Sequence, residues 1–356
     1  MKKVLSLAIA AALVAPAAAM ADATLYGKAH MVIQNTNIDD GATDDDVWSV
    51  DSIDSRVGIK GSEDLGDGLK AVYQYEFKIK HDSGDGLGDR NQFVGLAGGF
   101  GTVLLGRHDT PLKMAQGKFD QFGDVAGDIK SVMPGEDRVD NVIAYVSPAM
   151  GGLTFLGALV AGEEGDSVID GCADDITTTG GDSICVDPTF TTPELTGLAD
   201  HVSLAALYSN GPIFASLAYN TYDLGSVSEA DPSLLRGTFI WKGGMWQAGA
   251  MFSSLDLDDA GEDADAFGVS GNIKVGANGK IKAQYLSGDA PVDGAPISPS
   301  VKVTDGTKDN DVTQWSVGYE HKLSKRTKLH AGYTLYEEDD TGLEETALFG
   351  GLVHKF

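Results

Sequence analysis

Residues 69–80 read LKAVYQYEFKIK, and the alternation within this stretch decides the fold class. Every second side chain is apolar or aromatic, and most of those between are polar; the first set is Leu69, Ala71, Tyr73, Tyr75, Phe77 and Ile79. A period of two puts the two sets on opposite faces of a β-strand. The stretch therefore predicts a strand whose two faces meet different surroundings.

The same alternation recurs along the chain, for instance in 24–33, 314–319 and 348–356. Almost no segment has convincing helical periodicity, and 46 of the 356 residues are Gly. Apolar residues make up 42% of the sequence, which is too many for a disordered acidic chain. An all-β protein is expected.

The connections between these strands alternate strictly between short and long. The short ones are 63–68, 98–101, 147–152, 210–212, 243–244, 276–280 and 324–327; the long ones are 35–46, 80–89, 108–140, 161–200, 223–233, 255–265, 288–311 and 337–345. Seven short and eight long connections join sixteen antiparallel strands in an up-and-down meander, with every short turn at one end. A large secreted β-sandwich or solenoid is the alternative, but it does not explain this alternation.

Such a meander is typical of a transmembrane β-barrel with short periplasmic turns and long external loops. A closed barrel pairs every backbone polar group internally, as hydrocarbon requires. At roughly 16–18 strands a barrel is also wide enough for an aqueous channel.

The first residues have the features of a signal peptide. Lys2 and Lys3 precede an apolar run from Val4 to Ala19, and Ala19-Met20-Ala21 has the small-x-small form of a cleavage site. We therefore expect 1–21 to be removed and 22–356 to form the barrel domain. An N-terminal membrane anchor is the alternative, although the run is short for one.

Acidic residues are concentrated in the long connections. The chain has 53 Asp and Glu against 26 Lys and Arg, a net charge of −27 that argues against a nucleic-acid partner. The eight long connections hold 45 of these acidic residues and only 7 Lys or Arg. The predicted strands and turns are therefore mildly basic, which keeps negative charge out of the hydrocarbon zone.

Four motifs resemble the trimeric general porins of Gram-negative outer membranes, over the range from Ala23 to Phe356. They are Leu25–Lys28, Ser55–Ala71, the pair formed by Gly106-Arg107 and Arg138–Tyr145, and Gly351–Phe356. The resemblance implies a homotrimer in the cell outer membrane, in contact with lipid and lipopolysaccharide, that passes ions and small hydrophilic solutes. It also implies that the barrel-assembly machinery reads Phe356.

The resemblance further implies a constriction formed by the third long loop, 108–140, folded into the barrel. Its basic side would be Lys28, Arg56, Arg107 and Arg138. The alternation itself puts Lys28 and Arg56 on the polar face, whereas Arg107 shares its parity with Val103 and Leu105. These cations could instead simply solvate a polar lumen.

The acidic side of the constriction is harder to assign. Enteric porins often carry Pro-Glu-Phe-Gly at the loop tip, where this chain has Asp120-Gln121-Phe122-Gly123. The acidic candidates are therefore the neighbours Asp120, Asp124 and Asp128. Because charged rings set pore selectivity, the neutral Gln121 leaves the choice between anions and cations open.

The remaining motifs indicate no catalytic or metal centre. Cys172 and Cys185 lie in the longest external loop, where we expect a disulfide; two free thiols or a soft-metal site are the alternatives. No cofactor is predicted, although divalent cations bound by the Asp-rich loops stay possible. An outer-membrane barrel enzyme, an adhesin and a substrate-specific porin are the competing functions, but nothing matches a nucleophile elbow.

Overall fold

The structure is a computed structural model that describes residues 23–39, 41, 43–80, 86–162, 197–222, 232–256, 263–289, 311–339 and 342–356. The predicted signal peptide and both cysteines lie outside these ranges. The described strand segments form one antiparallel sheet: β1 (Thr24–Asp39), β2 (Asp44–Ser52), β3 (Arg56–Gly66), β4 (Leu69–Lys80), β5 (Gly86–Gly98), β6 (Gly101–Asp109), β7 (Arg138–Val146), β8 (Leu153–Val160), β9 (His201–Asn210), β10 (Ile213–Tyr222), β11 (Ser233–Gly243), β12 (Trp246–Asp256), β13 (Ala264–Val275), β14 (Gly279–Asp289), β15 (Asp311–Lys322), β16 (Thr327–Glu338) and β17 (Glu344–Lys355).

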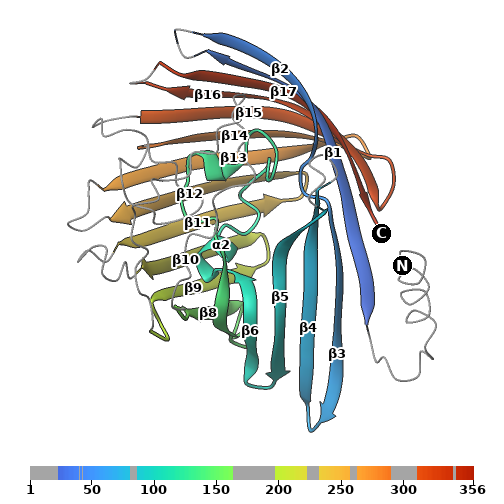
Figure 1. Cartoon of the computed structure of the whole chain (residues 1–356), viewed down its shortest axis with the longest axis vertical. Helices are drawn as coiled ribbons and strands as arrows, with labels where there is room; N and C mark the ends of the chain where they lie inside the picture. Colours follow the sequence, from blue (N-terminus) through green and yellow to red (C-terminus); the bar gives the residue numbers. More distant parts are fainter. Residues whose placement is uncertain are drawn as a thin grey trace, which may run out of the picture.

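The sheet closes into a ring because β1 pairs on one edge with β17 and on the other with both β2 and β3 (Figure 1). The register runs from Asp39↔Asp44 to Met31↔Ser52 and resumes at Lys28↔Arg56. β2 and β3 are therefore two parts of one strand. The seventeen described segments form sixteen barrel strands, which confirms the predicted fold.

The break between β2 and β3 is a defined structure. The Ser55 hydroxyl accepts a hydrogen bond from the backbone N–H of His30 at 2.9 Å and donates to the His30 carbonyl at 3.2 Å. The backbone N–H of Ile53 donates to the same carbonyl. One serine thus replaces the missing ladder bonds, and it leaves Asp54 buried on the inside of the barrel.

The first long connection is shorter than the sequence predicts. Residues 35–39 and 44–46 were expected in a loop but belong to β1 and β2. The side-chain amide of Asn35 donates to Asp46, and that of Asn37 donates to Asp44 at 2.6 Å. These cross-strand pairs extend the ladder through a polar sequence that carries no hydrophobic alternation.

The outer wall is apolar. Large side chains that face outward keep a substantial exposed area, among them Leu25, Ile33, Val94, Leu204, Trp315 and Leu348. The alternate positions hold buried polar groups such as Ser253 and Gln284. No helix in the described ranges is long and apolar enough to cross a membrane.

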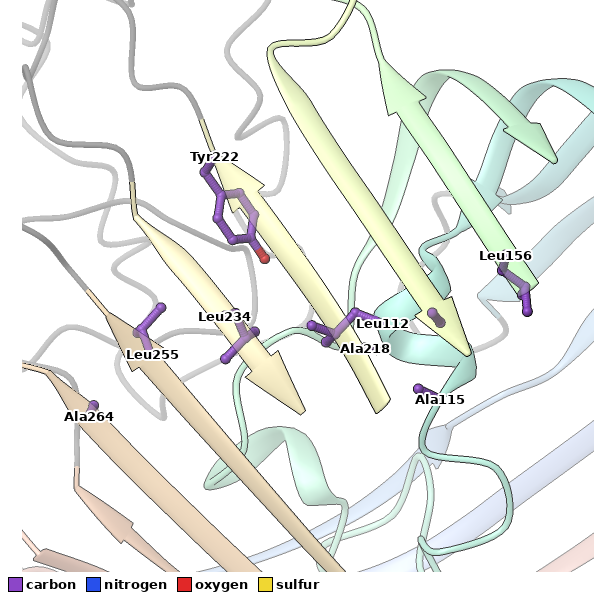
Figure 2. Close-up of a cluster of buried hydrophobic side chains, with 9 residues drawn as sticks. Leu112, Ala115, Leu156, Ala218, Tyr222, Leu234, Leu255 and Ala264 are labelled. Carbon is purple, nitrogen blue, oxygen red and sulfur yellow. The ribbon is translucent and has the colours of Figure 1, made fainter. Parts of the chain in front are cut away.

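The connection between β6 and β7 turns inward and contributes residues to three of the four buried apolar clusters. It carries α2 (Pro111–Met114) and the short 3₁₀ helix η1 (Ile129–Ser131), and it lies inside the ring in Figure 1. Leu112 and Ala115 pack against Ala218, Leu234 and other wall residues (Figure 2). The prediction that the third loop folds into the barrel agrees with this position.

The middle and tip of the loop fill hollows in the opposite wall. Phe119, Ile129 and Met133 form a second cluster with Ile240 and Leu286, and Phe122 forms another with Val32 and Phe349. Wall glycines make room for the two rings. A Cβ on Gly268 would lie 3.0 Å from Cζ of Phe119, and one on Gly318 would lie 2.9 Å from Cε1 of Phe122.

The first and the last strand of the barrel meet at Gly27 and Phe356. The backbone N–H groups of Gly27 and Phe356 each donate to the other's carbonyl at 3.1 Å. A Cβ at Gly27 would lie 2.2 Å from Cζ of Phe356, so the terminal ring covers a position that only glycine can hold.

We expect Gly27→Val to lower the free energy of unfolding by about 1–3 kcal/mol, because the new side chain collides with the ring that completes closure. The matched control is Gly237→Val on β11, where a Cβ meets nothing within 4 Å. Urea titration of protein folded into lipid vesicles measures both variants. Equal stability of the two would contradict the closure argument.

Candidate functional site

One side of the lumen carries a cluster of cations interleaved with carboxylates. The cations are Lys28, Arg56, Arg90 and Arg138, from β1, β3, β5 and β7. The carboxylates between them are Asp54, Glu76 and Asp109. We call these seven residues the basic wall.

Asp54 is the centre of the basic wall. Its carboxylate pairs with Lys28, with Nη1 of Arg56 at 3.1 Å and with Nη1 of Arg90 at 3.5 Å. The strand break described above places it there. A buried carboxylate with several cationic partners fixes their side chains as well as its own charge.

Glu76 extends the basic wall toward β5. It accepts hydrogen bonds from Nε of Arg90 at 2.5 Å and from the Tyr26 hydroxyl at 2.9 Å, and Nε of Arg56 lies 3.7 Å away. The register shifts here, from Tyr75↔Gln92 to Phe77↔Asp89. Two residues on β5 therefore stand opposite Glu76, and a bulge of this kind re-aims side chains. It brings Arg90 to Glu76.

Arg138 is held at the far end of the same wall. Its Nη2 lies 2.8 Å from Asp109, and its Nε donates to the side-chain oxygen of Asn91 at 2.5 Å. Asn91 in turn donates to Asp109 at 3.0 Å. Asn91 is the second residue of the β5 bulge, so one irregularity positions two cations.

Arg107 is paired elsewhere. Its Nη1 contacts Asp140 on β7, whose side chain is 57% exposed. The register between β6 and β7 shifts between Gly106 and His108, and Gly106 has a φ of 135°. This bulge explains why the alternation of side chains in the sequence did not decide which face of the strand carries Arg107.

The three acidic candidates of the loop have different roles. Asp120 accepts from the backbone N–H of Phe122 at 2.7 Å. Asp128 accepts from the backbone N–H groups of Asp124 at 2.5 Å and Lys130 at 2.9 Å. Both carboxylates therefore shape the loop. Asp124 is exposed and close enough to Lys28 and Arg56 for direct charge–charge attraction.

Burial and mutual repulsion also weaken the negative charge of this loop. Burial, followed by the nearby charge of Asp128, raises the pKa of Asp120 well above its usual range. Burial and the charge of Asp124 raise the pKa of Asp128. Carboxyl groups in such surroundings take up protons at a higher pH than exposed ones.

Gln121 fastens the loop tip to the far wall. Its backbone N–H donates to Gln284 at 3.0 Å, and its side-chain oxygen accepts from Asn272 at 2.8 Å. Lys282 donates to its carbonyl, and the Lys282 ammonium lies 4.5 Å from the ring centroid of Phe122. Gln121 occupies the position where enteric porins often carry a glutamate, and in this structure it anchors the loop tip.

A buried arginine fastens the base of the loop. Arg236 on β11 is completely buried and donates to Glu136 at 2.6 Å, to Ser253 at 3.2 Å and to the Pro134 carbonyl. Burial raises the pKa of Glu136 to about 7, although the Arg236 guanidinium acts against this rise. A buried charge without its partner is strongly destabilising, so the ion pair between Arg236 and Glu136 fixes the base of the loop to β11.

Three further lysines lie on β14 and β16, in the part of the wall that adjoins β1 through β17. Lys282 contacts the loop as described, while Lys328 lies 2.6 Å and Lys280 lies 3.9 Å from Glu320. Within these described ion pairs, cations outnumber carboxylates both in the basic wall and among the groups of β14 to β16. The described ranges hold no group of three or more His, Cys, Asp or Glu residues arranged to bind a metal ion.

A closed barrel with an apolar exterior, a charged interior and a loop that narrows it defines a membrane channel. The family model of the Gram-negative porins matches residues 7–341. The chain belongs to this family. It is a channel of the Gram-negative outer membrane through which small hydrophilic solutes diffuse passively, and a channel rather than an enzyme.

Individual relatives agree with this assignment. Outer membrane porin protein 32 of Delftia acidovorans is 28% identical over 99% of this chain and 95% of its own length. Among solved structures, an anion-selective porin from Comamonas acidovorans has a TM-score of 0.71 and 22% identity over 94% of this chain and 99% of its own. A trimer form of OmpT from Vibrio cholerae has a TM-score of 0.65 and 16% identity over 94% and 99% of the two chains.

The structure brings together Lys28, Arg56 and Arg138 from the predicted basic side. Sequence reasoning missed Arg90, Asp54 and Glu76 as members of this cluster. Glu76 was visible as a polar-face residue of 69–80, but the break and the bulge that bring Asp54 and Arg90 to it have no simple sequence signal. Arg107, which was also predicted for the basic side, pairs with Asp140 instead. The predicted disulfide between Cys172 and Cys185 lies outside the described residues.

We expect Arg236→Met to release the base of the loop, because the Glu136 carboxylate loses its buried partner at a cost of about 3–5 kcal/mol. Single-channel recordings in planar bilayers should then show larger current fluctuations than those of the wild type. The double variant Arg236→Met/Glu136→Leu should restore a quiet current, since an apolar pair leaves no buried charge unpaired. Quiet traces from the single variant would refute the anchoring role.

Proposed function

We propose that this porin is a general diffusion channel that prefers small hydrophilic anions. The observation that carries the proposal is the excess of cations over carboxylates among the described ion pairs of the inner wall. The basic wall has four cations against three carboxylates, and β14 and β16 carry three lysines near Glu320 of β15.

The state of the loop supports the same preference. Two of its three candidate carboxylates accept hydrogen bonds from backbone N–H groups of the loop itself, and their raised pKa values mean that they lose their charge at a higher pH than exposed carboxylates do. Only Asp124 faces Lys28 and Arg56 as an exposed carboxylate. A permeating anion therefore meets a net positive field at the narrow section. The structurally similar protein from Comamonas acidovorans is an anion-selective porin.

We further propose that the chain acts as a homotrimer in contact with outer-membrane lipid and lipopolysaccharide. The apolar outer wall provides a surface for both partners. The trimer form of OmpT, which shares the fold, supports this assembly. Native mass spectrometry of the purified protein measures the number of chains directly.

The reversal potential in a KCl gradient tests the anion preference. Wild-type channels in a planar bilayer should favour Cl⁻. Arg56→Ala/Arg138→Ala should shift the permeability ratio toward K⁺ by about fivefold, equivalent to about 1 kcal/mol of charge interaction. Arg107→Ala is the matched control, because its exposed pair with Asp140 should change the ratio by less than about twofold. A cation-preferring wild type would overturn the proposal.

The selectivity should also depend on pH. The pKa values of Asp120 and Asp128 are raised, so these groups lose their charge while exposed carboxylates, which titrate near 4, are still ionised. We therefore expect the Cl⁻/K⁺ ratio to begin to rise, as the pH is lowered from neutral, before the pH reaches the range near 4 in which exposed carboxylates titrate.

The double variant Asp120→Asn/Asp128→Asn tests whether these two groups carry the response to pH. It should start at the higher ratio and respond less to pH over the same range. A wild-type ratio that stays flat until the pH at which exposed carboxylates titrate would argue against a role for the loop.

A further inference from the structure

We propose that the outer wall carries a binding site for an anionic glycerophospholipid of the periplasmic leaflet. The site consists of an apolar hollow across β1, β2, β15, β16 and β17 and, at its periplasmic end, a set of cations and hydrogen-bond donors that can bind a phosphate. The proposal concerns the membrane-facing surface and does not depend on the ion preference of the lumen.

The hollow is a dent of about 650 Å³ in the apolar exterior. Its sides are large side chains such as Ile33, Leu329 and Leu352, which are about half exposed. Its floor is low because Ala331 and Gly350 stand opposite each other in the register of β16 and β17. The volume lies within the roughly 300–1,000 Å³ typical of ligand sites. An apolar hollow of this kind suits an acyl chain.

One end of the hollow points to the short-turn side of the barrel. His321 is part of its lining, and Leu329 lies three residues beyond Arg326 in the turn between β15 and β16. At about 3.3 Å per residue, the turn is about 10 Å from the near edge of the hollow. Short turns lie on the periplasmic side of such barrels. The lipid concerned therefore belongs to the periplasmic leaflet, whereas lipopolysaccharide would approach the end with the long loops.

The turn itself presents two free cations. Lys325 and Arg326 are exposed, and neither makes an ion pair within the part of the chain that the structure describes. The Ser324 hydroxyl accepts from the backbone N–H groups of Arg326 at 3.1 Å and Thr327 at 3.0 Å. The turn is therefore ordered, and it holds both cations at the level of the lipid headgroups.

Two oriented histidines lie between the turn and the hollow. The Tyr319 hydroxyl lies 3.0 Å from Nδ1 of His321, and the Thr327 hydroxyl lies 2.9 Å from Nδ1 of His354. With the hydroxyls as donors, each imidazole carries its hydrogen on Nε2 and can donate to a phosphate oxygen. Two cations and two imidazoles beside an apolar dent are complementary to a lipid with an anionic headgroup.

A second hollow on the same wall provides an internal control. It measures about 380 Å³ and is lined by Tyr285, Trp315, Tyr333 and Ala283, with no Lys, Arg or His among its lining residues. It lies near the middle of the strands, away from the turn. We expect it to contact acyl chains without distinguishing their headgroups.

Native mass spectrometry of the intact protein tests the proposal. The protein is released from mixed detergent micelles that contain equal amounts of palmitoyl-oleoyl phosphatidylglycerol and palmitoyl-oleoyl phosphatidylcholine. Wild type should retain the anionic lipid in clear excess over the zwitterionic one. Equal retention of the two lipids, or retention of neither, would overturn the proposal.

Three variants locate the site. Lys325→Gln and Arg326→Gln should each reduce retention of the anionic lipid by about fivefold, the effect of about 1 kcal/mol per cation near an anionic headgroup. Ala331→Phe should abolish the preference by filling the hollow, and Ala283→Phe in the second hollow should leave it unchanged. Conductance and the urea midpoint of each variant confirm that the barrel is folded.

Two results would identify a different occupant. If Ala331→Phe converts an oligomer to single chains and wild type retains no lipid, a second copy of the chain fills the hollow and the lipid proposal is wrong. If Ala283→Phe lowers anionic lipid retention as much as Ala331→Phe does, binding is a general property of the apolar wall, and the proposal is again wrong.

Discussion

The requirement that every backbone polar group in hydrocarbon be paired is the constraint on which this structure depends. It forces the sheet to close, and closure joins β1 to β17 near Gly27 and Phe356. It also explains why the break between β2 and β3 is satisfied by the Ser55 hydroxyl. Because irregular backbone is tolerated only where it is satisfied, the few irregular places in the wall are informative, and two of them build the basic wall.

A second constraint acts on the interior of the barrel. The loop that narrows it has little regular structure and must be fixed in place by its contacts with the wall. The loop is held by apolar clusters along its length and by polar anchors at both ends. Arg236 and Glu136 form the anchor at the base, while Gln121 with Lys282, Asn272 and Gln284 form the one at the tip. Such a loop keeps a fixed position in water, and this allows the charges beside it to set a defined field.

The fold could be predicted from the sequence because it depends on repeated, local signals. The alternation of 69–80 and the alternating lengths of the connections gave sixteen strands, and the structure confirms this number. The site was predicted less completely. The alternation of side chains along a strand places Lys28 and Arg56 on the inner face. Arg90 reaches Glu76 only through a register shift, and Asp54 reaches the cations only through a strand break. Such irregularities depend on tertiary pairing, which a single sequence does not reveal.

Gln121 shows the same limit in another form. Its position in the motif suggested a missing acid, yet its side chain and backbone make the contacts that fix the loop tip. An ionised glutamate there would meet the same carbonyl acceptors of Lys118 and Phe119 that the amide now satisfies, and it could not donate to them. The neutral residue is therefore required by the way this loop is held. The weak negative side of the constriction follows from that packing, and with it the balance of charge on which the proposed anion preference rests.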